Sequence, residues 1–315
     1  MDRKGDCMRI DRYLEYAKDV KDALLDGRPV VALESTILSH NLPYPQNVEI
    51  VKAVGDIIRA QGAVPATIAI INGRIQVGLS QENLEFLGKT PGIQKASRRD
   101  IPMILAREEH GATTVAATMV LADLAKIKVF VTGAIGGVHY GAESTFDVSA
   151  DLEELSRTNV AVVCSGVKPT QEIGRTLEVL ESKGVPVIGY QTAEFPAFYT
   201  EKSGYGVNAT VEDEKELALA IKFKWALGLK GGVVAANPIP KDKSLDQKLI
   251  DEGLQEGLIE GKKQNIQGKA WTAFLHNHIK SKVGDAWIES NGALLYSNAK
   301  VGAALAKELN DILYR

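Results

Sequence analysis

The chain has 315 residues, a length that suits one large α/β domain or two average domains. Its 37 Lys and Arg against 40 Asp and Glu give a formal net charge of −3, which argues against a general nucleic-acid binder, because such proteins carry a basic face. Hydrophobic residues make up 45% and no apolar run reaches the roughly 18 residues that span a bilayer. The N-terminus has no apolar signal segment and only two cysteines occur, so we expect a reduced, cytoplasmic protein.

Short β-branched runs alternate with segments of helical periodicity along the first three quarters of the chain. Six continuous apolar runs predict strands covered on both faces, at residues 29–36, 65–71, 128–135, 159–166, 185–192 and 231–239. Apolar residues at helical spacing predict helices over 47–61, 112–127, 149–158, 171–184 and 211–228. This alternation predicts right-handed βαβ units and a mostly parallel sheet. Residues 74–79, which follow Asn72-Gly73, predict a hairpin that makes the sheet mixed.

The last part of the chain has a different pattern. Residues 244–315 show helical periodicity without a convincing strand, and no linker or low-complexity tract separates them from the rest. We therefore predict a single domain over residues 1–315. Its fold is expected to be a three-layer α/β/α sandwich with a helical C-terminal extension over 244–315, and residues 1–8 are expected to be disordered.

Reactive side chains follow the apolar runs where ligands bind in open α/β sheets, at the carboxyl ends of strands. Lys168 comes after the run 159–166, and burial of its stem would favour the neutral amine that adds to an aldehyde. A second cation, for which Lys95 is the candidate, would act in the same direction. The alternative is a surface lysine before a helix that starts near Pro169. Glu34 ends the first apolar run and is either a general acid or base, or a helix cap or ion-pair partner.

Two further segments suit an anionic substrate or a cation. Asp147 and Asp151 are four residues apart at a predicted helix start, so we expect them on one helix face, where they either bind a divalent cation or serve the helix terminus. Residues 111–115, GATTV, are expected to open a long helix whose N-terminus would seat a phosphate. The five histidines form no metal motif, since His276 and His278 fall on different helix faces. Cys164 lies within an apolar run and is expected to be a buried structural thiol.

Several blocks in this order resemble the pseudouridine-5′-phosphate glycosidase family, also called indigoidine synthase A-like. The blocks are VALESTILSHNLPYPQN, KASRRD, GATTV, TGAIGGVHYGAESTFDVSAD, VAVVCSGVK and GGVVAANPIP, and the resemblance covers about nine tenths of the chain. It implies a homotrimer that reversibly cleaves the C–C glycosidic bond of pseudouridine 5′-phosphate to uracil and ribose 5-phosphate. It also implies a lysine Schiff base with the ring-opened ribose and one divalent ion, Mn²⁺, per subunit.

The resemblance implies roles for particular residues. Lys168 in VCSGVK matches the Schiff-base nucleophile and Glu34 in ALEST matches the proton donor. Asp147 matches the metal ligand, although Asp151 is an alternative as the closer one. The positions that match substrate contacts are Lys95, Val115, Ser149, Ala150, Asp151 and Asn291.

The chain departs from the family pattern at Asn41, Ala134 and Tyr140, where Gly, Gly and Arg are usual, and at Ser165 and Val167. None of these positions is Lys168 or Glu34. The departures keep open a second reading, a Schiff-base lyase that acts on a different phosphosugar or C-nucleotide. A third reading is a non-catalytic nucleotide-sensing trimer. In every reading the partner is a small molecule, with no nucleic acid and no membrane.

Overall fold

The computed structural model describes residues 12–266 and 269–314, so the prediction of disorder for residues 1–8 falls outside the described residues. In chain order the strands are β1 (Leu14–Tyr16), β2 (Val30–Leu33), β3 (Val64–Ile71), β4 (Arg74–Val77), β5 (Gln94–Ala96), β6 (Gly111–Thr113), β7 (Val129–Val131), β8 (Val138–His139), β9 (Ala161–Cys164), β10 (Gln171–Glu172), β11 (Val187–Tyr190), β12 (Ala209–Val211) and β13 (Val233–Ala236).

The helices alternate with these strands until β13 and then follow one another. They are α1 (Lys18–Leu25), α2 (Gln46–Ala60), α3 (Gln81–Lys89), α4 (Ile101–Ala106), α5 (Val115–Leu124), α6 (Ala142–Thr145), α7 (Ala150–Leu155), α8 (Ile173–Ser182), α9 (Glu214–Ala226), α10 (Gln247–Lys263), α11 (Lys269–Val283) and α12 (Ala286–Tyr314). A π-helical turn spans Ile37–Asn41 and a short 3₁₀ turn spans Lys241–Lys243.

The described residues form one 11-stranded sheet with a mostly parallel centre. Its main strand order is β1-β4-β3-β2-β7-β9-β13-β11-β12, and the strands from β3 through β2 to β12 pair in parallel. β4 runs antiparallel to β3, which confirms the predicted hairpin and the mixed sheet. β6 also pairs antiparallel with β3, and β5 pairs with β6. All six predicted strands are confirmed. Five are shorter than their apolar runs, and β3 begins one residue before its run.

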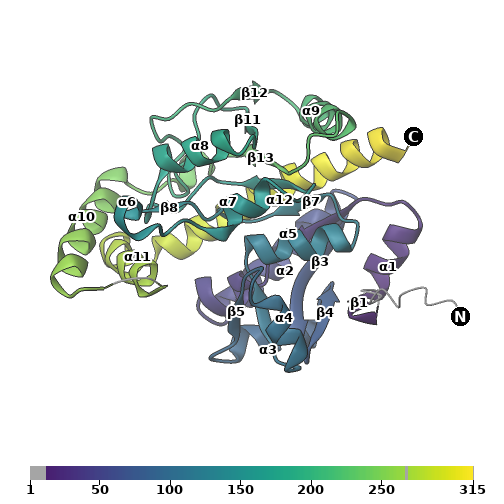
Figure 1. Ribbon diagram of the computed structural model, residues 1–315, viewed down its shortest axis with the longest axis horizontal. Helices are drawn as coiled ribbons and strands as arrows, with labels where there is room; N and C mark the ends of the chain where they lie inside the picture. Colours follow the sequence, from purple (N-terminus) through teal and green to yellow (C-terminus); the bar gives the residue numbers. More distant parts are fainter. Residues whose placement is uncertain (1–11, 267–268, 315) are drawn as a thin grey trace, which may run out of the picture.

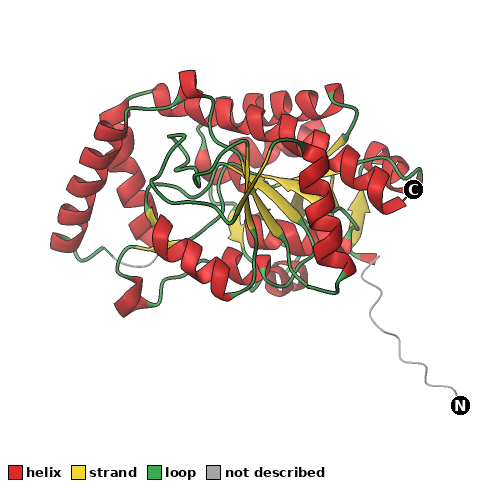
Figure 2. Cartoon of the chain, turned by 90° about the horizontal axis from the view of Figure 1, so that it is seen from above, coloured by secondary structure: helices red, strands yellow, loops and turns green. Residues whose placement is uncertain are grey.

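Helices cover both faces of the sheet, so the predicted three-layer architecture is confirmed (Figures 1 and 2). Successive residues of a strand point to opposite faces. In β2, Val31 and Leu33 join an apolar cluster with α2, α9 and α12, whereas Val30 and Ala32 join a second cluster with α1, α5, α7 and α8. Strands with both faces buried need apolar residues at every position, which explains the continuous runs in the sequence.

The C-terminal part is helical, as predicted, and packs against the same apolar cluster as α2 and α9. Within it, α10 and α11 lie side by side along a stripe of glycines (Figure 1). A Cβ added to Gly253 would lie 2.8 Å from the Cα of Ile279, and one added to Gly257 would lie 3.0 Å from Leu275. The two helices can therefore approach closely only because α10 carries glycine on this face. The single-domain assignment itself stays a prediction.

The predicted start of the helix over residues 112–127 is wrong. Residues 111–113 do not open a helix but form β6, because Ala112 and Gly111 find backbone partners on β3. Thr114 then caps α5, which begins at Val115, by accepting a hydrogen bond from the Ala117 N–H at 3.4 Å. In the described part of the chain, no helix is long and apolar enough to cross a membrane.

Candidate active site

Glu34 follows β2 and is held by two threonines. The Thr36 and Thr132 hydroxyls each donate a hydrogen bond to one of its carboxylate oxygens. Burial raises the pKa of the Glu34 carboxyl, the two hydroxyls and Lys168 oppose that rise, and Asp151 adds to it. Glu34 retains some accessible surface, as a group that exchanges protons with a ligand requires.

Lys168 follows β9 through a tight turn at Gly166. Gly166 has φ +82°, and a Cβ at this position would overlap the carbonyl oxygen of Pro196, so the turn requires glycine. The half-buried Lys168 ammonium donates a hydrogen bond to Asn41 Oδ1 at 3.2 Å and lies 5.8 Å from the centre of the Phe198 ring. This is an inward-facing lysine rather than the surface lysine of the alternative reading.

The surroundings of Lys168 favour its neutral amine. Burial, together with the positive charges of Lys95 and Lys280, lowers the pKa of Lys168 to about 8, although Glu34 acts in the opposite direction. The predicted effect of Lys95 is therefore present, and Glu34 and Lys168 belong to one electrostatic cluster. A neutral amine beside a carboxyl of raised pKa is a nucleophile beside a proton donor.

Lys95 lies at the centre of this cluster because of strand pairing. It is in β5, which pairs with β6 at residue 112 and so joins the main sheet at the site. Lys95 is exposed. Burial lowers the pKa of His40 and of His139, and the charge of Lys95 lowers both further, although Asp147 opposes the change at His139. Its position therefore suits an anionic ligand that enters from solvent.

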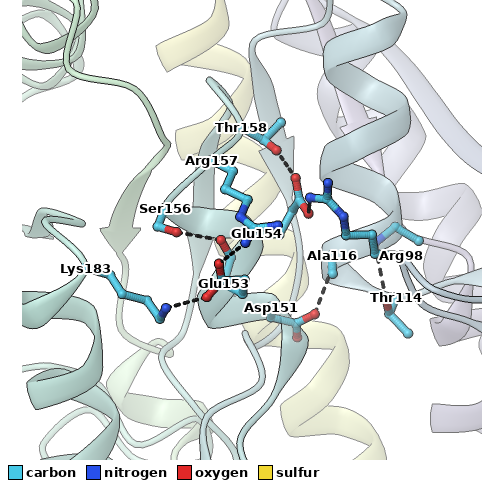
Figure 3. A network of polar contacts seen from close by, with 11 residues as sticks. Arg98, Thr114, Ala116, Asp151, Glu153, Glu154, Ser156, Arg157, Thr158 and Lys183 are labelled. Carbon is cyan, nitrogen blue, oxygen red and sulfur yellow. Dashed lines mark hydrogen bonds and ion pairs between the residues drawn. The ribbon is translucent and has the colours of Figure 1, made fainter.

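Asp151 connects the N-termini of two helices to the loop after β7. Its carboxylate accepts hydrogen bonds of 2.8 Å from the N–H groups of Ala116 and Gly136, the first of which is drawn in Figure 3. Burial raises the pKa of the Asp151 carboxyl, while these N–H groups and Lys95 oppose the rise. Val115 is buried, so only its backbone can meet a ligand.

The segment that carries Lys95 is tied to α7 by a second contact. Arg98 forms an ion pair with the buried Glu154, which also accepts a hydrogen bond from Thr158 (Figure 3). The Arg98 side chain is about half exposed, so removing Arg98 would leave the buried Glu154 carboxylate without its partner, whereas removing Glu154 would leave a solvated cation. The contact therefore fixes the segment that carries Lys95 against α7, which carries Asp151.

Asp147 and Asp151 do not share a helix face, so that prediction is wrong. Ser149 caps α7 by accepting a hydrogen bond from the Asp151 N–H at 3.2 Å, the helix begins at Ala150, and Asp147 lies in the loop before it. The backbone of Asp147 is nevertheless held beside residue 139, because the carbonyl of Asp147 accepts a hydrogen bond from the N–H of His139 at 3.1 Å.

The predicted metal position has one carboxylate. Within residues 12–266 and 269–314, no three His, Cys, Asp or Glu side chains could hold a metal ion together. Both oxygens of Asp151 already accept backbone hydrogen bonds, whereas the half-buried Asp147 side chain faces His139, whose pKa it raises. One carboxylate fits a hard cation that keeps several water ligands, so Asp147 suits such an ion better than Asp151 does.

Asn291 belongs to a buried polar group beside Lys168. Its amide donates hydrogen bonds to Tyr199 Oη at 3.0 Å and to the Trp287 carbonyl at 2.7 Å. His276 Nε2 lies 3.1 Å from the same Tyr199 oxygen, and burial with the charges of Lys168 and Lys280 lowers the pKa of His276 to about 2. His276 is therefore a neutral imidazole facing the site.

The sequence alone did not identify several of these residues. Thr36 and Thr132 directly follow strands and could have been inferred from their position after the apolar runs. Tyr199 and His276 gave no signal, because a contact across 77 residues leaves no local pattern. Cys164 is buried as predicted, and burial raises the pKa of its thiol to about 12, so it is no nucleophile.

Comparisons with known proteins identify relatives of this chain. A family model described as indigoidine synthase A like protein matches residues 19–308. A pseudouridine-5′-phosphate glycosidase of Alkaliphilus metalliredigens (strain QYMF) is 59% identical over 303 residues, 96% of this chain and 99% of the relative. One from Caldanaerobacter subterraneus subsp. tengcongensis is 54% identical with the same coverage.

Two solved structures resemble the fold closely. The prealnumycin C-glycosynthase AlnA, determined in complex with ribulose 5-phosphate, superposes with a TM-score of 0.91 at 34% identity and covers 96% of this chain and 98% of that one. An indigoidine synthase A-like protein from Thermotoga maritima superposes with a TM-score of 0.84 at 32% identity, over 94% and 96% of the two chains.

Proposed function

The chain belongs to the indigoidine synthase A-like protein family, and from that premise we propose that it is a pseudouridine-5′-phosphate glycosidase, which reversibly cleaves pseudouridine 5′-phosphate to uracil and ribose 5-phosphate. The observation that carries the proposal is the pairing of Lys168 with Glu34. Lys168 has a pKa lowered to about 8 by burial and nearby cations, and it lies within electrostatic reach of a carboxyl whose pKa burial raises.

The reaction breaks a C–C glycosidic bond, which ordinary nucleoside hydrolysis does not break. The base is attached to C1′ through a carbon atom, so there is no glycosidic nitrogen to protonate. When the ring opens, the bond between C1′ and the ring oxygen breaks, the oxygen takes a proton, and C1′ becomes an electrophilic carbon conjugated with the base. The neutral amine of Lys168 adds to C1′ without loss of water and gives up a proton to the Glu34 carboxylate. The base carbon then takes a proton, the bond between C1′ and that carbon breaks, and the nitrogen lone pair of Lys168 forms an imine with C1′. Water hydrolyses the imine to return the lysine and ribose 5-phosphate.

Glu34 is suited to move the protons in this sequence. A carboxyl with a raised pKa can be protonated near neutral pH, and the opening of the ring needs a proton on the ribose oxygen. The Thr36 and Thr132 hydroxyls fix the orientation of both carboxylate oxygens. Glu34 can then deliver a second proton to the base carbon.

The phosphate and the cation have separate places around Lys168. Lys95 and the N-terminus of α5, which begins at Val115, would hold the 5′-phosphate, and Ser149 and Ala150 border the same end of the site. Asp147 would hold the Mn²⁺ ion, with water in the remaining positions, and the ion when bound orders water around the opened sugar. A homotrimer and a cytoplasmic location are proposed from the family resemblance.

A product assay with reductive trapping tests the proposal. Incubation with pseudouridine 5′-phosphate and Mn²⁺ should release uracil, and borohydride should attach ribose 5-phosphate to Lys168, as located by peptide mass mapping. The Lys168→Ala variant should abolish both signals and retain the fold. Residual turnover in this variant would contradict the role of Lys168.

A second function is favoured by a specific contact. Asn41, which stands where the family usually has glycine, accepts a hydrogen bond from Lys168, so the surroundings of the nucleophile differ from the family pattern. This suits a Schiff-base lyase that acts on another phosphosugar or C-nucleotide. Trapping of ribose 5-phosphate at Lys168 without release of uracil would favour this second function over the glycosidase.

A further inference from the structure

One face of α11 carries polar side chains toward the site. Thr272, His276 and Lys280 are spaced four residues apart, so they form one stripe along the helix. Thr272 Oγ1 lies 3.4 Å from His139 Nδ1, and His276 contacts Tyr199. The adjacent stripe, which includes Leu275 and Ile279, is buried against α10.

The stripe ends at a lysine held over an aromatic ring. The Lys280 ammonium lies 3.8 Å from the centre of the Trp287 ring, and the Trp287 carbonyl accepts a hydrogen bond from Asn291. His276 packs edge-on against the same ring at 5.9 Å. Asn291, His276 and Lys280 therefore surround Trp287, next to the Phe198–Tyr199 pair that Lys168 contacts.

The lysines of the site interact with carboxylates only at longer range, where Lys168 acts on Glu34 and Lys95 acts on Asp151. In the described part of the chain, Lys95, Lys168 and Lys280 have no carboxylate within ion-pair distance, whereas Lys282, two residues along α11, pairs with Glu256 at 2.6 Å. A half-buried ammonium without a counter-ion favours a ligand that presents electron-rich oxygen.

Lys95 and Lys280 approach Lys168 from different elements. Lys95 is in β5 and acts on the pKa values of His40, His139 and Asp151, whereas Lys280 is in α11 and acts on that of His276. Both lower the pKa of Lys168. Thr272 of α11 lies beside His139, on which Lys95 acts, and Lys280 is about two turns further along the helix. If Lys95 takes the sugar phosphate, the Lys280 end of α11 is available to the group attached to C1′.

We propose that Lys280 is a substrate-binding residue at the base end of the site, where its ammonium donates a hydrogen bond to a carbonyl oxygen of a planar heterocyclic base. Trp287 keeps the ammonium in place, and the neutral His276 and Asn291 complete this subsite. The inference rests on the proposed function, since it assumes that the base is the leaving group.

The test compares Lys280→Met with Lys282→Met. Calorimetry with uracil, in the presence of ribose 5-phosphate, should show that Lys280→Met weakens uracil binding by roughly 10- to 100-fold, as expected for loss of a charge-assisted hydrogen bond. The Lys282→Met control should bind uracil as the wild type does. Lys280→Arg, which retains the charge and the ring contact, should restore most of the affinity.

Two readouts separate the possible outcomes. Borohydride capture of ribose 5-phosphate at Lys168 should still be detected in Lys280→Met, because that reaction does not involve the base. Its rate near neutral pH should fall, since Lys280 helps to lower the pKa of Lys168. Unchanged uracil binding, or loss of ribose 5-phosphate capture with uracil binding intact, would overturn the assignment, as would a wild type that does not bind uracil. A wild type that binds uracil but never releases it from pseudouridine 5′-phosphate would refute the glycosidase and leave the Lys280 comparison valid.

Discussion

The lowered pKa of Lys168 leads to a quantitative prediction about the pH dependence of Schiff-base formation. With a pKa of about 8, roughly 9% of the amine is neutral at pH 7, against about 0.03% for an ordinary lysine of pKa 10.5, a gain of roughly 300-fold. Capture of ribose 5-phosphate by borohydride, followed by mass spectrometry between pH 6.5 and 10, should therefore rise with pH and level off just above pH 8.

Matched variants isolate the contribution of this residue. Lys168→Ala should show no capture at any pH, and Lys248→Ala, whose side chain is 81% exposed, should follow the wild-type curve. A capture rate that continues to rise up to pH 10.5 would show that burial and neighbouring cations do not shift Lys168, and would refute the reasoning.

The same shift predicts a stability effect with a defined sign. Below pH 8 Lys168 is charged in both states and the folded state bears the full cost of burying the charge. Between pH 8 and 10.5 only the unfolded state holds the proton, so that cost disappears as the pH rises. Lys168→Met should raise the free energy of unfolding at pH 7 by at most on the order of 3 kcal/mol, with no gain near pH 10.5 in denaturant titrations.

Three further changes test the scaffold and the cation. Asn298→Ala removes a buried amide that bonds the Thr132 carbonyl, Ser165 and Asn237, and should cost about 2–4 kcal/mol in urea titrations. Asn310 is half-buried and makes a hydrogen bond at the surface, so Asn310→Ala should cost under about 1 kcal/mol, and equal losses would contradict this. Gly166→Ala should lower the melting temperature and the borohydride capture far more than Gly62→Ala does. The two glycines both have positive φ, but only Gly166 lies against another backbone atom. Capture by Gly166→Ala at the wild-type rate would show that the turn does not require glycine. Asp147→Asn should raise the Mn²⁺ concentration needed for half-maximal activity more than tenfold, and an unchanged Mn²⁺ requirement would exclude Asp147 as the ligand.

The sheet, the hairpin and the helical C-terminal part could be predicted from the sequence, because each depends on a local pattern of residues. A strand buried on both faces needs apolar residues at every position, and the run before Glu34 has them because α2 and α5 cover opposite sides of β2. Glu34 and Lys168 could be singled out for the same reason, since polar residues that end such runs lie at the ligand-binding edge of a parallel sheet.

Where one sequence pattern is compatible with two local conformations, the prediction from the sequence was wrong. Residues 111–113 suit a helix start, yet they form β6 because β3 offers an edge with free backbone groups. The four-residue spacing of Asp147 and Asp151 suits one helix face, yet Ser149 caps the helix between them, so only Asp151 lies in it. Backbone hydrogen bonds from distant segments decided both cases.

The amino-acid sequence by itself determined the order of strands and helices, the apolar faces that pack them, and the lysine and glutamate that end two central strands. Only the tertiary structure decided which side chains surround that lysine. Its lowered pKa depends on Lys95 from β5 and Lys280 from α11, and these elements are more than 70 residues distant from Lys168 in sequence. Charge–charge interaction depends on distance in space and on burial, and neither can be read from positions along the chain.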